Sequence, residues 1–165
     1  MIMKKILLPI TTAASILCIV GGVDFGASAQ NGNPVPPVAV NVVADVFANY
    51  FAIQKSLAAD SLANVASGGI AIASLVSADK SGAFRPELVA QAEVLAASPD
   101  LASARQTFKA VSGYLIQTWR AGKGPGGMIH EVHSPADNVD WLQQGEVIQN
   151  PYWGRACQQC GVFVK

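Results

Sequence analysis

The feature of this sequence that most restricts its fold is a helical spacing of apolar residues that recurs in four successive segments. Apolar side chains return every three or four positions, which places them on one stripe of an α-helix. The segments cover residues 38–58, 60–76, 86–96 and 98–120. Their expected buried positions are Val42, Val46, Phe47, Tyr50, Ile53 and Leu57; Leu62, Val65, Ile70, Ile72, Leu75 and Val76; Leu88, Val89, Ala92, Leu95 and Ala96; and Leu101, Ala104, Phe108, Val111, Leu115, Ile116 and Trp119. Four amphipathic helices with short connections predict a mainly α fold, a small antiparallel helical bundle.

Local signals set the expected ends of these helices. We expect Asp60 to cap the second helix, Pro86 to lie in the first turn of the third, and Ser98-Pro99-Asp100 to start the fourth. Gly122–Gly127 ends the fourth helix. Gly68-Gly69 lies inside the second helix and costs about 2 kcal/mol of helix propensity relative to alanine. Either this helix is kinked there, or a neighbour packs closely against its bare backbone.

The C-terminal part, residues 122–165, differs from the helical segments. From Met128 onward it contains Pro135 and Pro151, few periodic apolar runs, and both histidines. We therefore predict an irregular segment that packs across the bundle. Its expected anchors are Trp141, Leu142, Tyr152 and Trp153.

The first 29 residues have the three parts of a secretory signal peptide. Lys4 and Lys5 precede an uncharged apolar stretch from Ile6 to Val23, and the small residues Ala27-Ser28-Ala29 follow. The alternative is a membrane anchor, but 18 positions are at the lower limit of a span. We predict cleavage after Ala29 and a periplasmic protein. Residues 30–37 then form a Pro-rich lead-in, and residues 38–165 a single domain.

The charge of the chain restricts the classes of partner that we expect it to bind. Lys and Arg number 11, Asp and Glu also 11, and only 13% of residues are charged against 51% hydrophobic. This composition excludes intrinsic disorder, and a nucleic-acid binder usually carries a basic stripe. Near-neutral charge also gives no steering toward an anionic lipid surface. We expect no nucleic-acid partner and, after cleavage of the signal peptide, no membrane.

Two histidines and one methionine are candidate metal ligands. His130 and His133 are three positions apart, and on a helix or turn that spacing can put both rings on one side, where imidazoles bind zinc or copper. Met128 could add a thioether for Cu(I). The alternatives are two hydrogen-bonded polar histidines and a methionine used for packing.

The two cysteines outside the signal peptide form a Cys157-Gln-Gln-Cys160 motif. Such a pair can be a redox disulfide, a pair of metal-binding thiolates or a structural disulfide. A thioredoxin-like site needs alternating strands and helices, which this sequence does not show. An oxidising compartment favours a structural disulfide, and two thiolates with a histidine also suit Cu(I) or Zn(II).

We find no catalytic pattern in the sequence and expect a protein that is not an enzyme. There is no Gly-x-Ser-x-Gly nucleophile motif and no histidine–glutamate zinc-protease spacing. Gly122–Gly127 lacks the Gly-Lys-Ser/Thr ending of a phosphate-binding loop.

Several blocks of the sequence resemble the DUF3347 family of exported bacterial domains, which are also appended to periplasmic adaptor subunits of heavy-metal and copper efflux systems. The most specific block is Glu146–Gly154, containing Asn150-Pro151-Tyr152-Trp153-Gly154. Trp141-Leu142-Gln143, Cys160-Gly161, residues 49–60 and residues 105–112 also match. The resemblance implies a compact helical domain that handles copper or another heavy metal, with a metal ion and an efflux adaptor or other periplasmic protein as partners.

The sequence departs from the family at its sulfur positions. Ser134-Pro135-Ala136 stands where the family commonly has Cys-Pro-Met-Ala, and Cys157 stands where it has methionine, while Cys160 matches. Two functions therefore stay open. One is a metal-handling domain with ligands among Cys157, Cys160, His133, His130 and Met128, for copper in preference to zinc. The other is a structural or protein-interaction module with a degenerate metal site and a Cys157–Cys160 disulfide.

Overall fold

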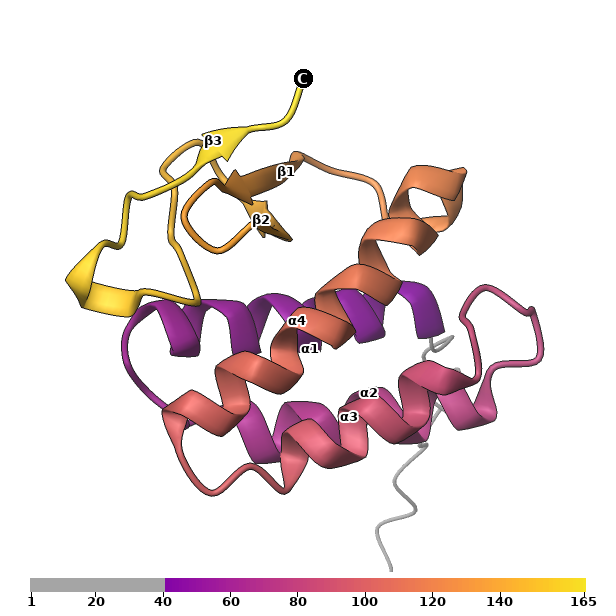
Figure 1. The fold of residues 1–165 in the computed structure, drawn as a ribbon. Coiled ribbons are helices and arrows are strands. Elements are labelled where there is room, and N and C mark those ends of the chain that lie inside the picture. Colours follow the sequence, from indigo (N-terminus) through magenta and orange to yellow (C-terminus); the bar gives the residue numbers. More distant parts are fainter. Residues whose placement is uncertain (1–40) are drawn as a thin grey trace, which may run out of the picture. The chain divides into compact units, whose positions relative to one another are not determined.

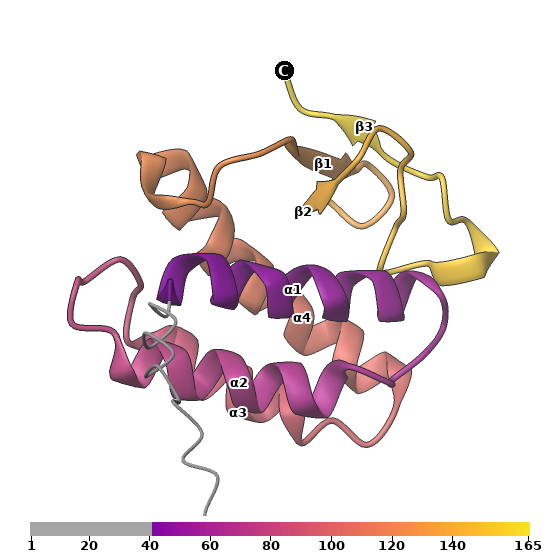
Figure 2. The ribbon, with the colours of Figure 1, turned by 180° about the vertical axis from the view of Figure 1, so that it is seen from behind.

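Four helices account for the first two thirds of the computed structural model, which describes residues 41–165. They are α1 (Val42–Ala58), α2 (Val65–Ala78), α3 (Glu87–Ala96) and α4 (Leu101–Thr118), and Figures 1 and 2 show them stacked below the C-terminal part. The prediction of a mainly helical fold built on four helices is confirmed. The expected signal peptide, its cleavage site and the Pro-rich lead-in lie outside the described residues. Within residues 41–165, each helix is too short or too polar to cross a membrane.

The core of the bundle consists of the predicted apolar stripes. Phe47, Tyr50 and Phe108 are fully buried, and the rings of Tyr50 and Phe108 stack with their centroids 5.0 Å apart. Ile70 is the exception. It is 63% exposed, whereas Ile72, two positions further along α2, is fully buried. Burial of the stripes is the main driving force for packing these helices together.

The Gly68-Gly69 pair lets α2 approach a helix on either side of it. A Cβ atom on Gly68 would lie 2.9 Å from the Ile53 side chain on α1, and one on Gly69 would lie 2.7 Å from the Ala92 carbonyl oxygen on α3. The helix is continuous through both glycines. Of the two explanations offered by the sequence, close packing is the correct one.

Two of the expected helix starts are wrong. Helix α2 begins at Val65, because Asp60 adopts a positive φ of 55° and turns its carboxylate away to bind Arg105. In α4 the cap is Asp100, whose side chain accepts a hydrogen bond of 2.7 Å from the Ser103 N–H, so Ser98 lies outside the helix. At its other end α4 continues into a π-helical turn, η1 (Trp119–Lys123), in which Gly122 departs from helical geometry with a φ of 72°.

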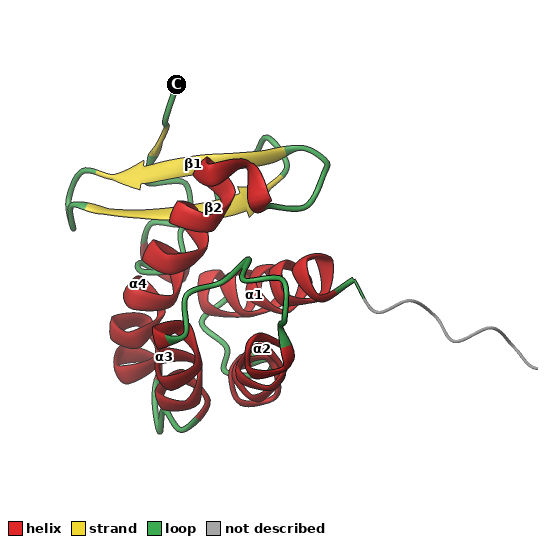
Figure 3. Ribbon diagram, turned by 90° about the vertical axis from the view of Figure 1, so that its right-hand side faces the viewer, coloured by secondary structure: helices red, strands yellow, loops and turns green. Residues whose placement is uncertain are grey.

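The C-terminal part contains a small antiparallel sheet, which corrects the prediction of an irregular segment. Its strands are β1 (Ile129–Ser134), β2 (Val139–Gln144) and β3 (Val162–Phe163), in the order β2-β1-β3. Figure 3 shows β1 and β2 lying side by side above α1 and α2, with the upper end of the α4 helix overlapping the strands in this view. A four-residue turn joins them, and its last residue, Asn138, has a φ of 51°. A short 3-10 helix, η2 (Gly154–Ala156), lies between β2 and β3.

The sheet lies between the helices and the rest of the C-terminal segment. One face carries Glu131, and its carboxylate binds the guanidinium of Arg120 at the end of α4. The other face carries Trp141, which Tyr152 meets edge-on at 5.9 Å. Trp141, Leu142 and Tyr152 are buried anchors, as predicted. The prediction for Trp153 is wrong, because its ring is 43% exposed and its indole N–H donates to the carboxylate of Asp137.

Candidate functional site

The two histidines lie on β1, and this strand separates their rings. Side chains three positions apart on a strand point to opposite faces of the sheet. The ring of His133 binds Asp140, its neighbour across β2, through Nδ1 and Oδ1 at 2.7 Å. The ring of His130 lies on the other face, 5.1 Å from the ring of Phe163. The His-x-x-His spacing therefore does not bring the two imidazoles together.

His130 has one unusual feature. Its Nε2 atom is buried and has no hydrogen-bond partner among residues 41–165. Met128, two positions before it, precedes the strand and is 61% exposed. Neither residue pairs with a cysteine in the sheet, because Cys157 and Cys160 lie outside its three strands.

Cys157 and Cys160 form a disulfide, with their Cα atoms 5.3 Å apart. Their four-residue loop joins η2 to β3, and Cys160 is exposed while Cys157 is half-buried. In this state the sulfurs are not thiolates, which are the form that binds metals. Across residues 41–165, no three His, Cys, Asp or Glu side chains are grouped to hold a metal ion. The structure brings Cys157 and Cys160 together but places His130 and His133 on opposite faces of the sheet, and binding of copper or zinc stays a prediction.

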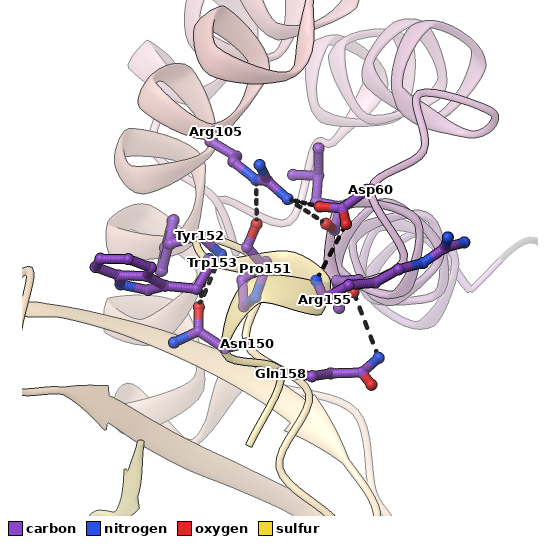
Figure 4. Close-up of polar contacts among 10 residues, drawn as sticks. Asp60, Arg105, Asn150, Pro151, Tyr152, Trp153, Arg155 and Gln158 are labelled. Carbon is purple, nitrogen blue, oxygen red and sulfur yellow. Dashed lines mark hydrogen bonds and ion pairs between the residues drawn. The ribbon is translucent and has the colours of Figure 1, made fainter. Parts of the chain in front are cut away.

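The Asn150-Pro151-Tyr152-Trp153-Gly154 turn is held by several side-chain hydrogen bonds (Figure 4). Asn150 is fully buried, and its Oδ1 accepts hydrogen bonds from the backbone N–H groups of Tyr152 and Trp153, at 2.8 and 3.1 Å. Its Nδ2 donates to the Cys160 carbonyl at 2.6 Å. One amide side chain thus holds both the turn and the disulfide loop.

Arg105 fixes this turn to the helices. Its Nε donates to the Pro151 carbonyl at 2.8 Å, and its Nη2 donates to the Leu57 carbonyl at 2.9 Å and to the carboxylate of Asp60 (Figure 4). Asp60 also accepts from the Arg155 N–H at 3.1 Å. The guanidinium of Arg105, with this N–H as the second cause, lowers the pKa of the Asp60 carboxyl.

Gly154 is required where the turn meets this ion pair. Its φ is 54°, a conformation that only glycine adopts readily. A Cβ atom there would overlap the Asp60 carboxylate and the Arg105 guanidinium. The glycine of the block is thus explained by close approach as well as by backbone conformation.

Further polar side chains of the helices bind the C-terminal backbone. Gln54 on α1 donates to the Gln149 carbonyl at 2.5 Å, and the Tyr50 hydroxyl accepts from the Leu142 N–H at 3.0 Å. Tyr50 and Tyr152 both lie within 3.4 Å of the Ser112 hydroxyl. Burial raises the pKa of both tyrosines, so they stay neutral.

The outer side of the turn presents Trp153, Arg155 and the disulfide loop 157–160 to solvent. We call these residues the turn surface. Figure 4 shows Trp153 and Arg155 pointing to opposite sides of the turn. The sequence does not mark either side chain as a candidate binding residue, because an aromatic or basic residue in a loop can be a buried anchor or an exposed group.

An open hollow of about 270 Å³ lies between α4 and β2. Arg120 and Asp140 are among its lining residues, but Arg120 is bound to Glu131 and Asp140 to His133. Arg120 and Asp140 are therefore already paired, and Lys109, the third charged residue of the lining, lies over the ring of Tyr152 with its Nζ 5.8 Å from the ring centroid, so the hollow does not combine a free acid with a free base.

No protein-family model, no curated protein and no solved structure matches this chain. The resemblance to the DUF3347 family stays a prediction.

Proposed function

We propose that this chain is a non-enzymatic, exported module that binds a protein partner through its turn surface. The observation that supports this most is the contrast at residues 150–155. The backbone of the turn is held by Asn150 and Arg105, while Trp153 and Arg155 remain exposed. A turn held so firmly, with large side chains facing outward, is suited to binding.

Two general properties of interfaces support the proposal. Tryptophan and arginine are enriched among the residues that contribute most to binding energy. A surface that is rigid before binding loses less conformational entropy when a partner arrives. Trp153 has this rigidity, because its backbone N–H is bonded to Asn150 and its indole N–H to Asp137.

Site-specific photocrosslinking in cells that naturally produce the chain tests the proposal. A photoreactive amino acid at Arg155 should give a discrete crosslinked product, and Trp153→Ala in the same chain should remove it. The matched control is the same photoreactive residue at Ile70, an exposed position on α2. Equal products from both positions, or a product that survives Trp153→Ala, would count against the turn surface.

Metal handling, the other function predicted from the resemblance, is tested separately. Calorimetric titration with Cu(I), Cu(II) and Zn(II) is done on the oxidised and the reduced protein and on the variants His130→Ala and His133→Ala. If the module acts only through protein binding, the heats measured with each of the three metals are the same for the wild type and for the two histidine variants. Stoichiometric copper binding that His133→Ala abolishes would support the metal-handling function instead.

A further inference from the structure

We propose that the Cys157–Cys160 disulfide is a reversible redox site that exchanges with the dithiol of another protein. This goes beyond the binding function proposed above and does not depend on it. It also differs from a purely structural disulfide, which the sequence left open. Three observations on the loop carry the argument.

The first observation is access. Cys160 is exposed and Cys157 half-buried, so an incoming thiolate can reach the sulfur of Cys160. Exchange needs direct attack on a disulfide sulfur, and exposed disulfides are the ones that react. The residues between the cysteines, Gln158 and Gln159, are exposed and uncharged, so they present no charge that would repel a thiolate.

The second observation is that the loop keeps its place through bonds that do not involve sulfur. The Gln158 carbonyl accepts from the Asn150 N–H at 2.7 Å, and the Cys160 carbonyl accepts from Asn150 Nδ2 at 2.6 Å. The Gln158 side chain donates to the Ala58 carbonyl at the end of α1, at 3.3 Å. The Cys160 N–H closes the loop onto the Cys157 carbonyl at 3.0 Å. Reduction therefore leaves the two thiols side by side.

The third observation is the length of the loop. The disulfide joins cysteines only three positions apart. The entropy that a crosslink removes from the unfolded chain grows with the loop it closes. A disulfide this short restricts the unfolded chain little, so breaking it leaves the fold largely intact. Folding and redox chemistry are thus separable at this site.

The exchange has two steps. A thiolate of the partner attacks the Cys160 sulfur, a mixed disulfide forms, and Cys157 leaves with the electron pair as a thiolate. The second thiolate of the partner then attacks the partner's first sulfur, which is bonded to Cys160 in the mixed disulfide. The partner's two sulfurs form a disulfide, and Cys160 leaves with the electron pair as a thiolate. The partner dithiol is oxidised by two electrons, its two protons pass to Cys157 and Cys160, and the disulfide of this chain is reduced.

Equilibration of the full chain in glutathione buffers of rising reduced-to-oxidised ratio tests the proposal. Thiols are alkylated and counted by mass, and far-UV circular dichroism is recorded on the same samples. We expect a reversible gain of two adducts with an unchanged helical signal. Two results would overturn the proposal: a disulfide that stays closed in excess reduced glutathione but opens once urea unfolds the chain, or reduction accompanied by loss of the helical signal.

Single-cysteine variants test the direction of attack. Cys157→Ser leaves the exposed Cys160, whose thiolate should attack oxidised glutathione, form a mixed disulfide and release reduced glutathione about tenfold faster than the half-buried Cys157 that remains in Cys160→Ser. Equal trapping rates would contradict attack at Cys160. The two experiments have separate readouts, because this one counts glutathione adducts at the cysteines and the photocrosslinking reports on a partner at Trp153 and Arg155.

Discussion

The helices and the C-terminal sheet are held together by different interactions. Between the helices most buried contacts are apolar, as in the stacked rings of Tyr50 and Phe108, and the bond between the Tyr50 and Ser112 hydroxyls is a buried polar contact beside them. In the C-terminal part, buried amide side chains bind backbone groups. Gln143 accepts from the Gln149 N–H and donates to the Val147 carbonyl, and Asn150 bonds the turn. Apolar packing tolerates small shifts of one helix against another. The amide side chains instead fix the path of the C-terminal backbone, which has few hydrogen bonds of regular secondary structure.

The largest decrease in the free energy of unfolding is expected from Phe108→Ala, which tests whether the sheet depends on the apolar core. Phe108 is fully buried, stacks on Tyr50, and lies 6.1 Å from the ring of Tyr152. Removing its ring should lower the free energy of unfolding by about 4 kcal/mol, measured by urea denaturation. Ile70→Ala, at an exposed apolar position, should change it by less than about 0.5 kcal/mol. A similar loss in both variants would show that the apolar contacts are not specific.

The next largest loss of stability is expected from Asn150→Ala, which removes the side-chain hydrogen bonds that hold the turn and the disulfide loop. The N–H groups of Tyr152 and Trp153 lose their acceptor, and the Cys160 carbonyl loses its donor. Buried groups left unpaired in this way should cost about 2–3 kcal/mol. Hydrogen exchange should accelerate at residues 150–160 while the amides of α2 and α3 stay protected. The control is Gln159→Ala in the same loop, and uniform acceleration in Asn150→Ala would refute a local role.

The same contrast explains which parts of the fold the sequence could predict. Periodic apolar residues identify the helices, because burial of one stripe requires that spacing. The hairpin was missed because β1, Ile-His-Glu-Val-His-Ser, lacks a clean alternation of apolar and polar residues. Glu131 is an inward-facing charge that is buried only because Arg120 binds it. The turn of Pro135–Asn138 between two short segments was the available signal for a hairpin.

The candidate site was harder to predict than the fold, since its bonds join residues far apart in the sequence. The spacing of Cys157 and Cys160 left a disulfide and a pair of metal-binding thiolates open, the predicted oxidising compartment favoured the disulfide, and the structure has one. The bond from Arg105 to Pro151 spans 46 positions, and nothing local in the sequence marks either partner. Exposure of Trp153 follows from that bond network, so it could not be read from a hydrophobic pattern.

Alanine substitutions at two helical glycines should change the stability of the bundle by smaller amounts and in opposite directions. Gly69→Ala places a Cβ atom against the backbone of α3, and such overpacking should cost about 2 kcal/mol. Gly113→Ala on α4 meets open space and should add about 0.5–1 kcal/mol, because alanine favours the helix. Thermal denaturation of both variants measures the difference. Destabilisation by Gly113→Ala would mean that its open face is needed for more than helix formation.

The smallest effect concerns pH and the ion pair that joins the two regions. The pKa of Asp60 is lowered in the folded protein, first by Arg105 and then by the Arg155 N–H. Its contacts therefore add to the free energy of unfolding above the ordinary aspartate pKa of about 4, and this contribution is lost as the pH falls below that value. Asp60→Asn keeps an oxygen acceptor but does not ionise. Urea denaturation at pH 6 and pH 3 should show a difference between wild type and variant that shrinks at the lower pH.

Arg105→Met is the control that separates this contact from the other carboxylates of the chain. Without the guanidinium, the largest cause of the lowered pKa of Asp60 is gone. The pH dependence of the difference between Arg105→Met and the double variant Arg105→Met/Asp60→Asn should then be weaker than that between wild type and Asp60→Asn. The same pH dependence in both backgrounds would mean that Arg105 holds the turn only through the Pro151 and Leu57 carbonyls. In that case Arg105 would join the helices to the turn as the buried amides Gln143 and Asn150 do, by hydrogen bonds from a side chain to backbone groups.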